Sequence, residues 1–308
     1  MSKSSSGGSH VSDRAKEERR LGWKLAGPAF VIMVLVTFYP ILQAVYSSLF
    51  KHRLTDPGGQ RFVFLENYLI ILRDPLWWQA FGTTAFITVV TVVVELVLGF
   101  LIALAMAKII LGRGLLRTVV LIPYSIITVV SAFSWLYAFA TDTGFVDPLL
   151  HSLSFGAFPK DFNWFGGFWT SMVPICVSEI WKTTPFMSLL LLAGLTQIDS
   201  AMEEAAIVDG ATWGERMRRV VLPNMKSAIM VALLFRTLDA FRIFDNIFIM
   251  TAGSHDTASL SLVAYNQTIS RTEVGLGSAV SVLLFLCVVI IAVIFVKGFR
   301  VDLARGRR

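Results

Sequence analysis

Charged residues are scarce in this sequence: they make up 16% of its 308 residues, whereas 55% are hydrophobic. A soluble domain carries about 25% charged residues. Cysteine is also rare, and both cysteines, Cys176 and Cys287, lie inside apolar segments without a CxxC pattern. These shortages exclude an ordinary soluble domain, a disulfide framework and a cysteine metal site.

Catalytic and nucleotide-binding motifs are missing as well. The sequence contains no GxxxxGK[ST], HExxH or GxSxG, and its four histidines show no metal-ligand spacing. The formal net charge is +6, but no basic stripe carries interleaved stacking aromatics, so nucleic acid is not an expected partner. We expect no catalytic site, no metal site and no cofactor bound by this chain itself; a membrane enzyme would need acids and histidines clustered at one interface.

Long apolar runs dominate the sequence instead. A helix needs about 20 apolar residues to cross the hydrocarbon core, and open strands cannot stand in lipid. The sequence predicts an all-α polytopic membrane protein. Its six expected transmembrane helices are Leu25–Leu49, Ala80–Ala107, Leu115–Ala140, Phe168–Ile198, Ser227–Met250 and Val274–Val296.

The basic residues predict the orientation of these spans. With the N-terminus inside, eighteen Lys and Arg fall in cytoplasmic segments and six in outer segments. Cytoplasmic loops carry such an excess, so both termini are expected in the cytoplasm. We divide the chain into a flexible tail (1–22), a membrane domain (23–299) and a basic tail (300–308). The aromatic cluster at 162–169 fits either an interfacial belt or a sugar-stacking site.

A charged island, EEAAIVDGATWGERMRRVVLPNMK, lies between the fourth and fifth spans. Ser200 with Glu203 and Thr212 with Glu215 match the S/T-x-x-E capping box that starts a helix. Gly210 suits a sharp turn, and Pro223 is expected to end the second helix. The pattern predicts two short helices at an angle on the cytoplasmic face. They form either an amphipathic linker on lipid headgroups or a rigid docking element for a partner.

The island also carries a family motif. Glu204-Ala205-Ala206, Gly210 and Val220-x-Leu222-Pro223 follow the spacing EAA-x3-G-x9-I-x-LP, with Val220 in place of Ile. This resembles the EAA loop of the permease subunits of binding-protein-dependent ABC importers. The segments EIWKTTPFMSLLLLAGLTQI and LLFRTLDAFRIFDNIFIMTAG resemble the carbohydrate-uptake branch, which includes maltose-type permeases, and within it the permeases of actinobacterial trehalose importers. The resemblance covers roughly Trp23 to Phe299.

The resemblance implies an ABC importer permease fold and a set of partners. These are a second permease subunit, two copies of a cytoplasmic ATPase that bind ATP and Mg, and an extracytoplasmic sugar-binding protein. It further implies that the loop at 199–223 couples this chain to the ATPase. Glu204 would make the polar contact, Gly210 the turn, and Ala205, Ala206 and Leu222, next to Pro223, the apolar packing. The implied substrate is trehalose, with maltose-type sugars and glycerol phosphate as alternatives.

Ionisable residues inside the predicted spans are costly in lipid and should face the bundle or a wet cavity. Glu179 and Lys182 are spaced to pair on one helix. Four residues at every third position are expected to spiral around the fifth span and not to line one channel face. Either these charges form a structural ion ladder, or some of them, with Asn246, bind sugar hydroxyls or form a gate. The candidates are Arg236, Asp239, Arg242, Asp245, Asn246, Glu179 and Lys182; Glu95 also lies within a span.

A proton-coupled secondary carrier is the main rival. Glu95 has no obvious partner on its own helix and could carry a proton. Such a carrier would not need the charged island, which favours the importer. The outer loops contain six Lys and Arg against eight Asp and Glu, so nothing there attracts an anion, and a neutral sugar is favoured over glycerol phosphate.

Overall fold

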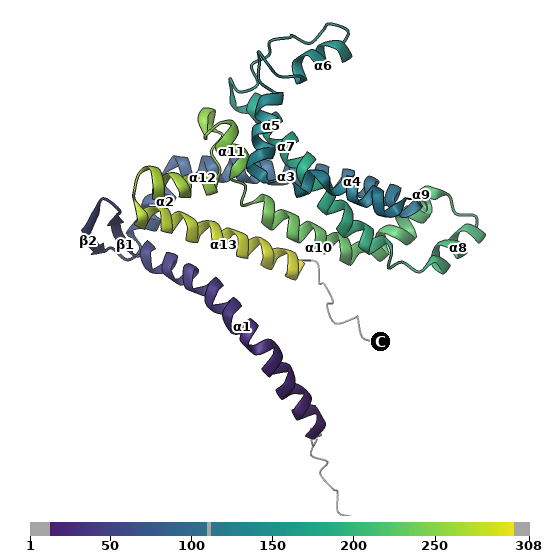
Figure 1. Ribbon diagram of the computed structural model, residues 1–308, viewed down its shortest axis with the longest axis horizontal. Coiled ribbons are helices and arrows are strands. Elements are labelled where there is room, and N and C mark those ends of the chain that lie inside the picture. Colours follow the sequence, from purple (N-terminus) through teal and green to yellow (C-terminus); the bar gives the residue numbers. More distant parts are fainter. Residues whose placement is uncertain (1–12, 110–111, 299–308) are drawn as a thin grey trace, which may run out of the picture.

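The computed structural model describes residues 13–109 and 112–298 as a helical membrane domain with one small hairpin (Figure 1). The basic tail predicted at 300–308 and the start of the predicted flexible tail lie outside the described residues. Residues 13–22 of that tail are helical. The α-helices are α1 (Asp13–Ser48), α2 (Glu66–Arg73), α3 (Pro75–Lys108), α4 (Arg113–Ser125), α5 (Thr128–Ala138), α6 (Val146–Leu153), α7 (Phe168–Leu195), α8 (Ser200–Val208), α9 (Trp213–Arg216), α10 (Leu222–Ala240), α11 (Asp245–Met250), α12 (Leu260–Tyr265) and α13 (Val274–Gly298).

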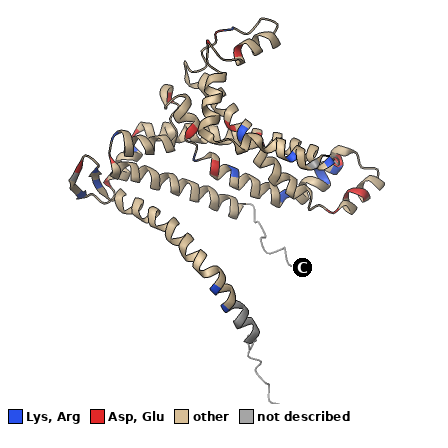
Figure 2. Cartoon of the chain, in the orientation of Figure 1, with Lys and Arg blue, Asp and Glu red and all other residues tan. Residues whose placement is uncertain are grey.

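The remaining elements are short. Strands β1 (Phe50–Arg53) and β2 (Asp56–Phe62) pair antiparallel. A 3₁₀ turn, η2, covers Ser254–Asp256, and two π-helical turns cover Met217–Val221 (η1) and Asn266–Ser270 (η3). Helices α3, α7 and α13 carry few charges, and charges gather around α8 and α9 and near the middle of the fold (Figure 2).

Within the described residues, four helices are long and apolar enough to cross a membrane: α1 from Arg20, α3, α7 and α13. Helix α3 shows how the chain starts such a span. Pro75 occupies its first turn, where the missing N–H is harmless, and the Asp74 carboxylate accepts the N–H of Leu76 at 2.9 Å. The predicted second, fourth and sixth spans therefore correspond closely to α3, α7 and α13.

The predicted third span is not one straight helix. It is divided into α4 and α5, which meet at an angle of 83°. Pro123 lies in the last turn of α4 and cannot donate a backbone hydrogen bond. The pair meets the length and composition required of a single span only when both helices are taken together.

The predicted fifth span is also wrong as a continuous helix. Helix α10 ends at Ala240, and α11 starts at Asp245. Ser259, from a distant loop, donates its hydroxyl to the carbonyl of Ile243 at 2.9 Å and so holds the turn between the two helices. Because α10 contains Lys226, Arg236 and Asp239, it carries too many charges to qualify as a span by composition.

Helices α3, α4, α7, α10 and α13 lie side by side, whereas α1 leaves this layer and contacts it mainly near α13 (Figure 1). The closest packing joins α3 to α7. At Gly99 a Cβ atom would lie 2.9 Å from the Met187 side chain, so the two helices approach as closely as a glycine permits. Small residues of this kind allow van der Waals packing in lipid, where burial from water contributes little.

The aromatic cluster at 162–169 has two different environments. Trp164 is buried, and its indole N–H donates to Asp147 at 2.6 Å, which fixes the segment carrying α6. Trp169, by contrast, is 68% exposed. Trp164 is therefore a structural residue, and neither an interfacial belt nor a sugar-stacking platform accounts for it.

Candidate functional site

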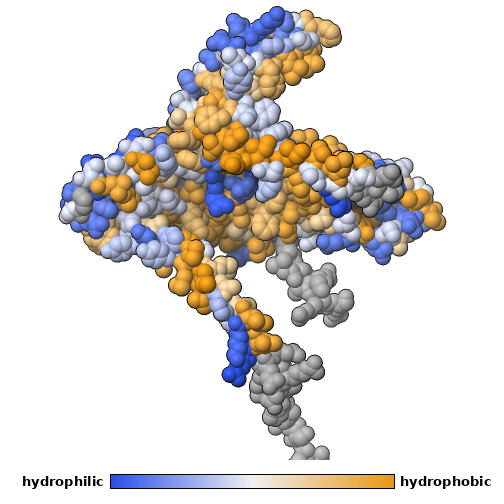
Figure 3. All heavy atoms as spheres, in the orientation of Figure 1, coloured by the Kyte–Doolittle hydropathy of each residue, from blue (hydrophilic) through white to orange (hydrophobic). Residues whose placement is uncertain are grey.

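A polar cavity of about 380 Å³ lies where α10 ends. Three segments form its walls: Tyr124 and Thr128 from the corner between α4 and α5, three residues of α7, and the stretch from Asp239 to Asn246. Figure 3 shows a hydrophilic patch surrounded by apolar surface near the middle of this face. The complete lining is Tyr124, Thr128, Glu179, Lys182, Thr183, Asp239, Arg242, Ile243, Phe244, Asp245 and Asn246.

Six of the seven charged or amide residues singled out from the sequence line this one cavity; the exception is Arg236. The expectation that the row of charges spirals around one helix was wrong. The turn after Ala240 ends the helical rotation, so Asp239, Arg242 and Asp245 reach the same space. The lining thus combines three carboxylates with two cations, one of them an arginine.

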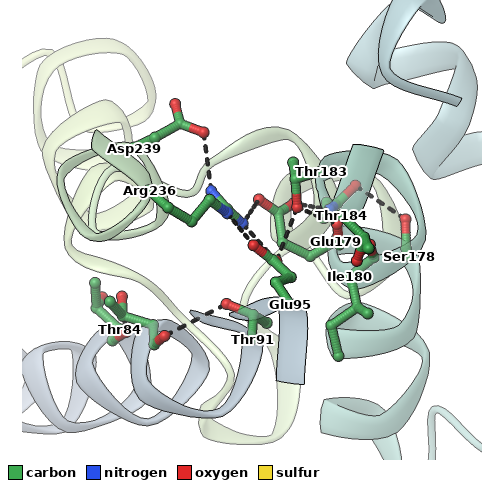
Figure 4. A network of polar contacts seen from close by, with 12 residues as sticks. Thr84, Thr91, Glu95, Ser178, Glu179, Ile180, Thr183, Thr184, Arg236 and Asp239 are labelled. Carbon is green, nitrogen blue, oxygen red and sulfur yellow. Dashed lines mark hydrogen bonds and ion pairs between the residues drawn. The ribbon is translucent and has the colours of Figure 1, made fainter. Parts of the chain in front are cut away.

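Arg236 is not part of the cavity lining, but it joins three helices through its polar contacts (Figure 4). Its side chain is only 1% exposed. The guanidinium pairs with both oxygens of Glu95 on α3 and donates to Glu179 on α7 at 2.7 Å. Its remaining terminal nitrogen donates to Asp239 at 2.9 Å. A planar group with five donors suits this arrangement, which a lysine could not reproduce.

The two buried carboxylates of this network have further donors. The Thr183 hydroxyl donates to Glu95 at 2.8 Å, and the side-chain amide of Asn246 donates to the second oxygen of Glu179 at 2.7 Å. Both oxygens of Glu179 are therefore engaged inside the protein. Asp239, whose side chain is 63% exposed, also lines the cavity.

The predicted Glu179–Lys182 pair does not form. Glu179 is bound to Arg236 and Asn246 instead. Lys182 turns the other way and donates to the backbone carbonyls of Tyr124 and Ile126. Sequence analysis also missed Tyr124, Thr128 and Thr183, which carry no charge and so gave no signal inside an apolar segment.

The charged island forms a second candidate site, at the far end of α7. No residue of α8 is buried, and Glu204 and Ala205 lie on its surface. Met202, Ile207, Val208 and Trp213 are large apolar side chains that remain 46%, 53%, 86% and 56% exposed. An element that leaves this much apolar surface uncovered is typical of a partner interface.

Gly210 makes the turn that separates α8 from α9. Its φ of +79° is in the left-handed region, and open space surrounds the position of a Cβ. The N–H of Gly210 bonds to Ile207, and that of Ala211 bonds to Ala206, which is the Schellman arrangement at a helix end. The glycine is thus required for backbone conformation and not for a close approach.

The helix starts in the island differ in part from the prediction. Asp199, and not Ser200, caps α8 by accepting the N–H of Ala201 at 3.0 Å. The capping box of Thr212 and Glu215 is confirmed. The backbone N–H and hydroxyl of Thr212 bond to the Glu215 carboxylate and hold its pKa below the usual value.

The prediction that Pro223 ends the second helix of the island was wrong. Pro223 lies in the first turn of α10. Helix α9 continues through the π-helical turn η1 directly into α10 with helical backbone angles throughout. The second part of the island, from Trp213 onward, and the helix that carries Arg236 and Asp239 therefore form one continuous helical segment.

Comparisons with known proteins identify this arrangement. Residues 95–302 match the family described as binding-protein-dependent transport system inner membrane component. The chain belongs to this family. Membership of this family explains the many long apolar segments of the sequence. The protein is a multi-pass inner membrane protein.

Curated relatives match over most of the chain. It is 49% identical to the trehalose transport system permease protein SugA of Mycobacterium tuberculosis, over 92% of this chain and 89% of that protein. It is 36% identical to the trehalose/maltose transport system permease protein MalF of Thermococcus litoralis, over 91% and 94%. A crystal structure of a bacterial ABC transporter that imports alginate has the same fold, with a TM-score of 0.76 at 18% identity over 94% of this chain and 100% of that chain.

Proposed function

We propose that this chain is the permease subunit of an ATP-driven importer and forms half of the translocation pathway for a di- or oligosaccharide, with trehalose as substrate. The cavity at the end of α10 carries the proposal. Its volume of about 380 Å³ lies within the roughly 300–1,000 Å³ typical of small-molecule sites. Carboxylate, guanidinium and amide groups in its walls suit the hydroxyl groups of a sugar.

The charge balance of the cavity favours a neutral substrate. Glu179, Asp239 and Asp245 outnumber Lys182 and Arg242, and Lys182 is already bonded to backbone carbonyls. Because Lys182 is bonded to carbonyls and Arg236 to carboxylates, a phosphate ester would find few cations here that are free to bind it. The names of the two curated relatives, which mention trehalose and maltose, point the same way.

In this proposal the membrane topology is that of six crossings with both termini in the cytoplasm. Helices α4 with α5 form the third crossing, and α10 with α11 forms the fifth. The breaks place backbone turns and polar side chains beside a cavity, which is where a membrane protein tolerates non-helical backbone. The excess of Lys and Arg in the segments that this orientation places inside, eighteen against six outside, supports it.

The partners follow from the second site. The exposed apolar side chains of α8 and α9, with Glu204 on the surface, form a docking element for a cytoplasmic ATPase, of which two copies serve this chain and a second permease. ATP and Mg would bind to that ATPase, and this chain would be non-catalytic. A sugar-binding protein would deliver the substrate from the opposite side of the membrane.

The experiment that tests the function is ATP-driven uptake in proteoliposomes. The chain is purified with the proteins that co-purify with it, identified by mass spectrometry, and supplied with its binding protein. Labelled trehalose should accumulate only with ATP inside, and unlabelled maltose and glycerol phosphate show which alternative competes. Recovery of the chain alone, with uptake driven by a proton gradient, would refute the importer and support the secondary carrier.

A further inference from the structure

The corner between α4 and α5 has backbone carbonyls without a helical partner. When a helix stops, its last carbonyls have no N–H one turn further along the chain. In lipid such groups must be satisfied by other parts of the protein. At this corner the carbonyls in question belong to Tyr124 and Ile126, on either side of the point where α4 ends.

Lys182 supplies the missing donors from α7. Its ammonium group donates to the carbonyl of Ile126 and, at 3.5 Å, to that of Tyr124, and the residue is only 7% exposed. The C-terminal end of a helix carries partial negative charge, which favours a cation there. The same nitrogen lies 5.9 Å from the centre of the Tyr124 ring, and that ring stacks on Phe186 of α7 at 5.2 Å.

The corner is also a wall of the polar cavity. Tyr124, Thr128 and Lys182 line one side, and the stretch from Asp239 to Asn246 lines another. Helix α5, beyond the corner, packs against α11, which carries Asp245 and Asn246. The position of the corner on α7 therefore determines the distance between the two walls.

We propose that Lys182 is a positioning residue: its ammonium group latches the α4–α5 corner to α7 and so sets the shape of the cavity that the transport cycle uses. A buried lysine bonded only to carbonyls at a helix break fits this role better than that of a substrate contact. The claim about the cycle rests on the proposed transport function, whereas the claim about the corner does not.

Spin labels test the latch in the assembled complex. The labels are attached at Tyr137→Cys on α5 and Thr196→Cys after α7, in a background with Cys176→Ala and Cys287→Ala. Pulsed electron paramagnetic resonance then measures the distance between them, which reports the position of α5 relative to α7. We expect one narrow distance distribution in the parent and in Lys182→Arg, which keeps the charge and the donors. Lys182→Met should broaden or shift it. Lys160→Met, an exposed lysine in an outer loop, is the matched control and should change nothing.

Transport is measured on the same variants as sugar taken up per ATP hydrolysed. Lys182→Met should lower this ratio about tenfold, the effect expected when loss of a charged hydrogen bond shifts an equilibrium between two conformations. Lys182→Arg should restore most of it. A tenfold loss that Arg restores separates a positioning role from a general loss of folded complex.

Each outcome decides one part of the proposal. An unchanged distance distribution in Lys182→Met overturns the latch, whatever happens to uptake. A changed distribution with an unchanged uptake ratio overturns its role in the cycle. If Lys182→Met does not assemble, Lys182→Gln, which keeps an amide donor without charge, gives the same comparison. If the parent complex takes up no sugar, the proposed function fails while the distances still test the latch.

Discussion

Replacement of Arg236 with methionine should destabilise the protein strongly. The substitution keeps the length and volume of the side chain roughly similar but removes the only cation bonded to Glu95 and Glu179 in the network described above. Glu95 is fully buried and the Glu179 side chain is 10% exposed, so two carboxylates would be left without their counter-ion. Removal of one partner from a buried ion pair reduces stability by about 3–5 kcal/mol.

The assay is thermal unfolding of the purified complex, followed by tryptophan fluorescence. For a chain of this size a loss of 3–5 kcal/mol lowers Tm by ~10 °C. Arg73→Met, on the exposed surface of α2, is the matched control and should leave Tm almost unchanged. Arg236→Lys keeps the charge but loses the planar fork, so we expect an intermediate Tm.

A double-mutant cycle tests the cause. Glu95→Gln removes one of the two buried negative charges, so Arg236→Met combined with Glu95→Gln should be less destabilised than the sum of the single variants. An Arg236→Met variant as stable as the parent, or strictly additive effects in the double variant, would refute the reasoning. The network would then not be what holds α3, α7 and α10 together.

The remaining predictions concern the two candidate sites. Glu204→Ala combined with Gly210→Pro should abolish uptake while membrane insertion stays normal, because proline destroys the turn at φ +79° but α8 contributes no buried residue; normal uptake would exclude the docking role. Asp239→Asn should lower uptake without a large loss of stability, since its side chain is 63% exposed; unchanged uptake would remove it from the pathway. The pKa of Glu215 is lowered by Thr212, so this cap stabilises the folded state above the ordinary carboxyl pKa and is lost as pH falls through the lowered value. Amide exchange over α9 should therefore be faster in Glu215→Gln than in the parent at neutral pH, and the difference should vanish in acid; a difference that persists in acid would contradict this.

Much of the helical architecture follows from local properties of the sequence. Helices α3, α7 and α13 coincide with predicted spans because each is a long run of apolar residues, which the sequence shows directly. The turn at Gly210 and the cap at Thr212 were also predictable from local sequence. Each depends on residues within one helical turn.

The break after Ala240 and the partners of the buried charges depend on distant residues and could not be predicted. The turn after Ala240 contains no proline or glycine, and it is held by Ser259, which no local pattern connects to it. The partner of Glu95 lies 141 residues away in the sequence. Local spacing suggested Glu179 and Lys182 as a pair, but a buried arginine and a broken helix offered each of them stronger partners.

The proposed function requires that sugar pass through the cavity at the end of α10. Its most direct test is the uptake rate after a small thiol reagent has modified Thr128→Cys, which lies in the cavity wall, in the background lacking Cys176 and Cys287. We expect that modification blocks uptake, that trehalose supplied by its binding protein with ATP slows the modification, and that modified Lys160→Cys transports normally. Uptake at the parent rate by fully modified Thr128→Cys would show that the sugar takes another route.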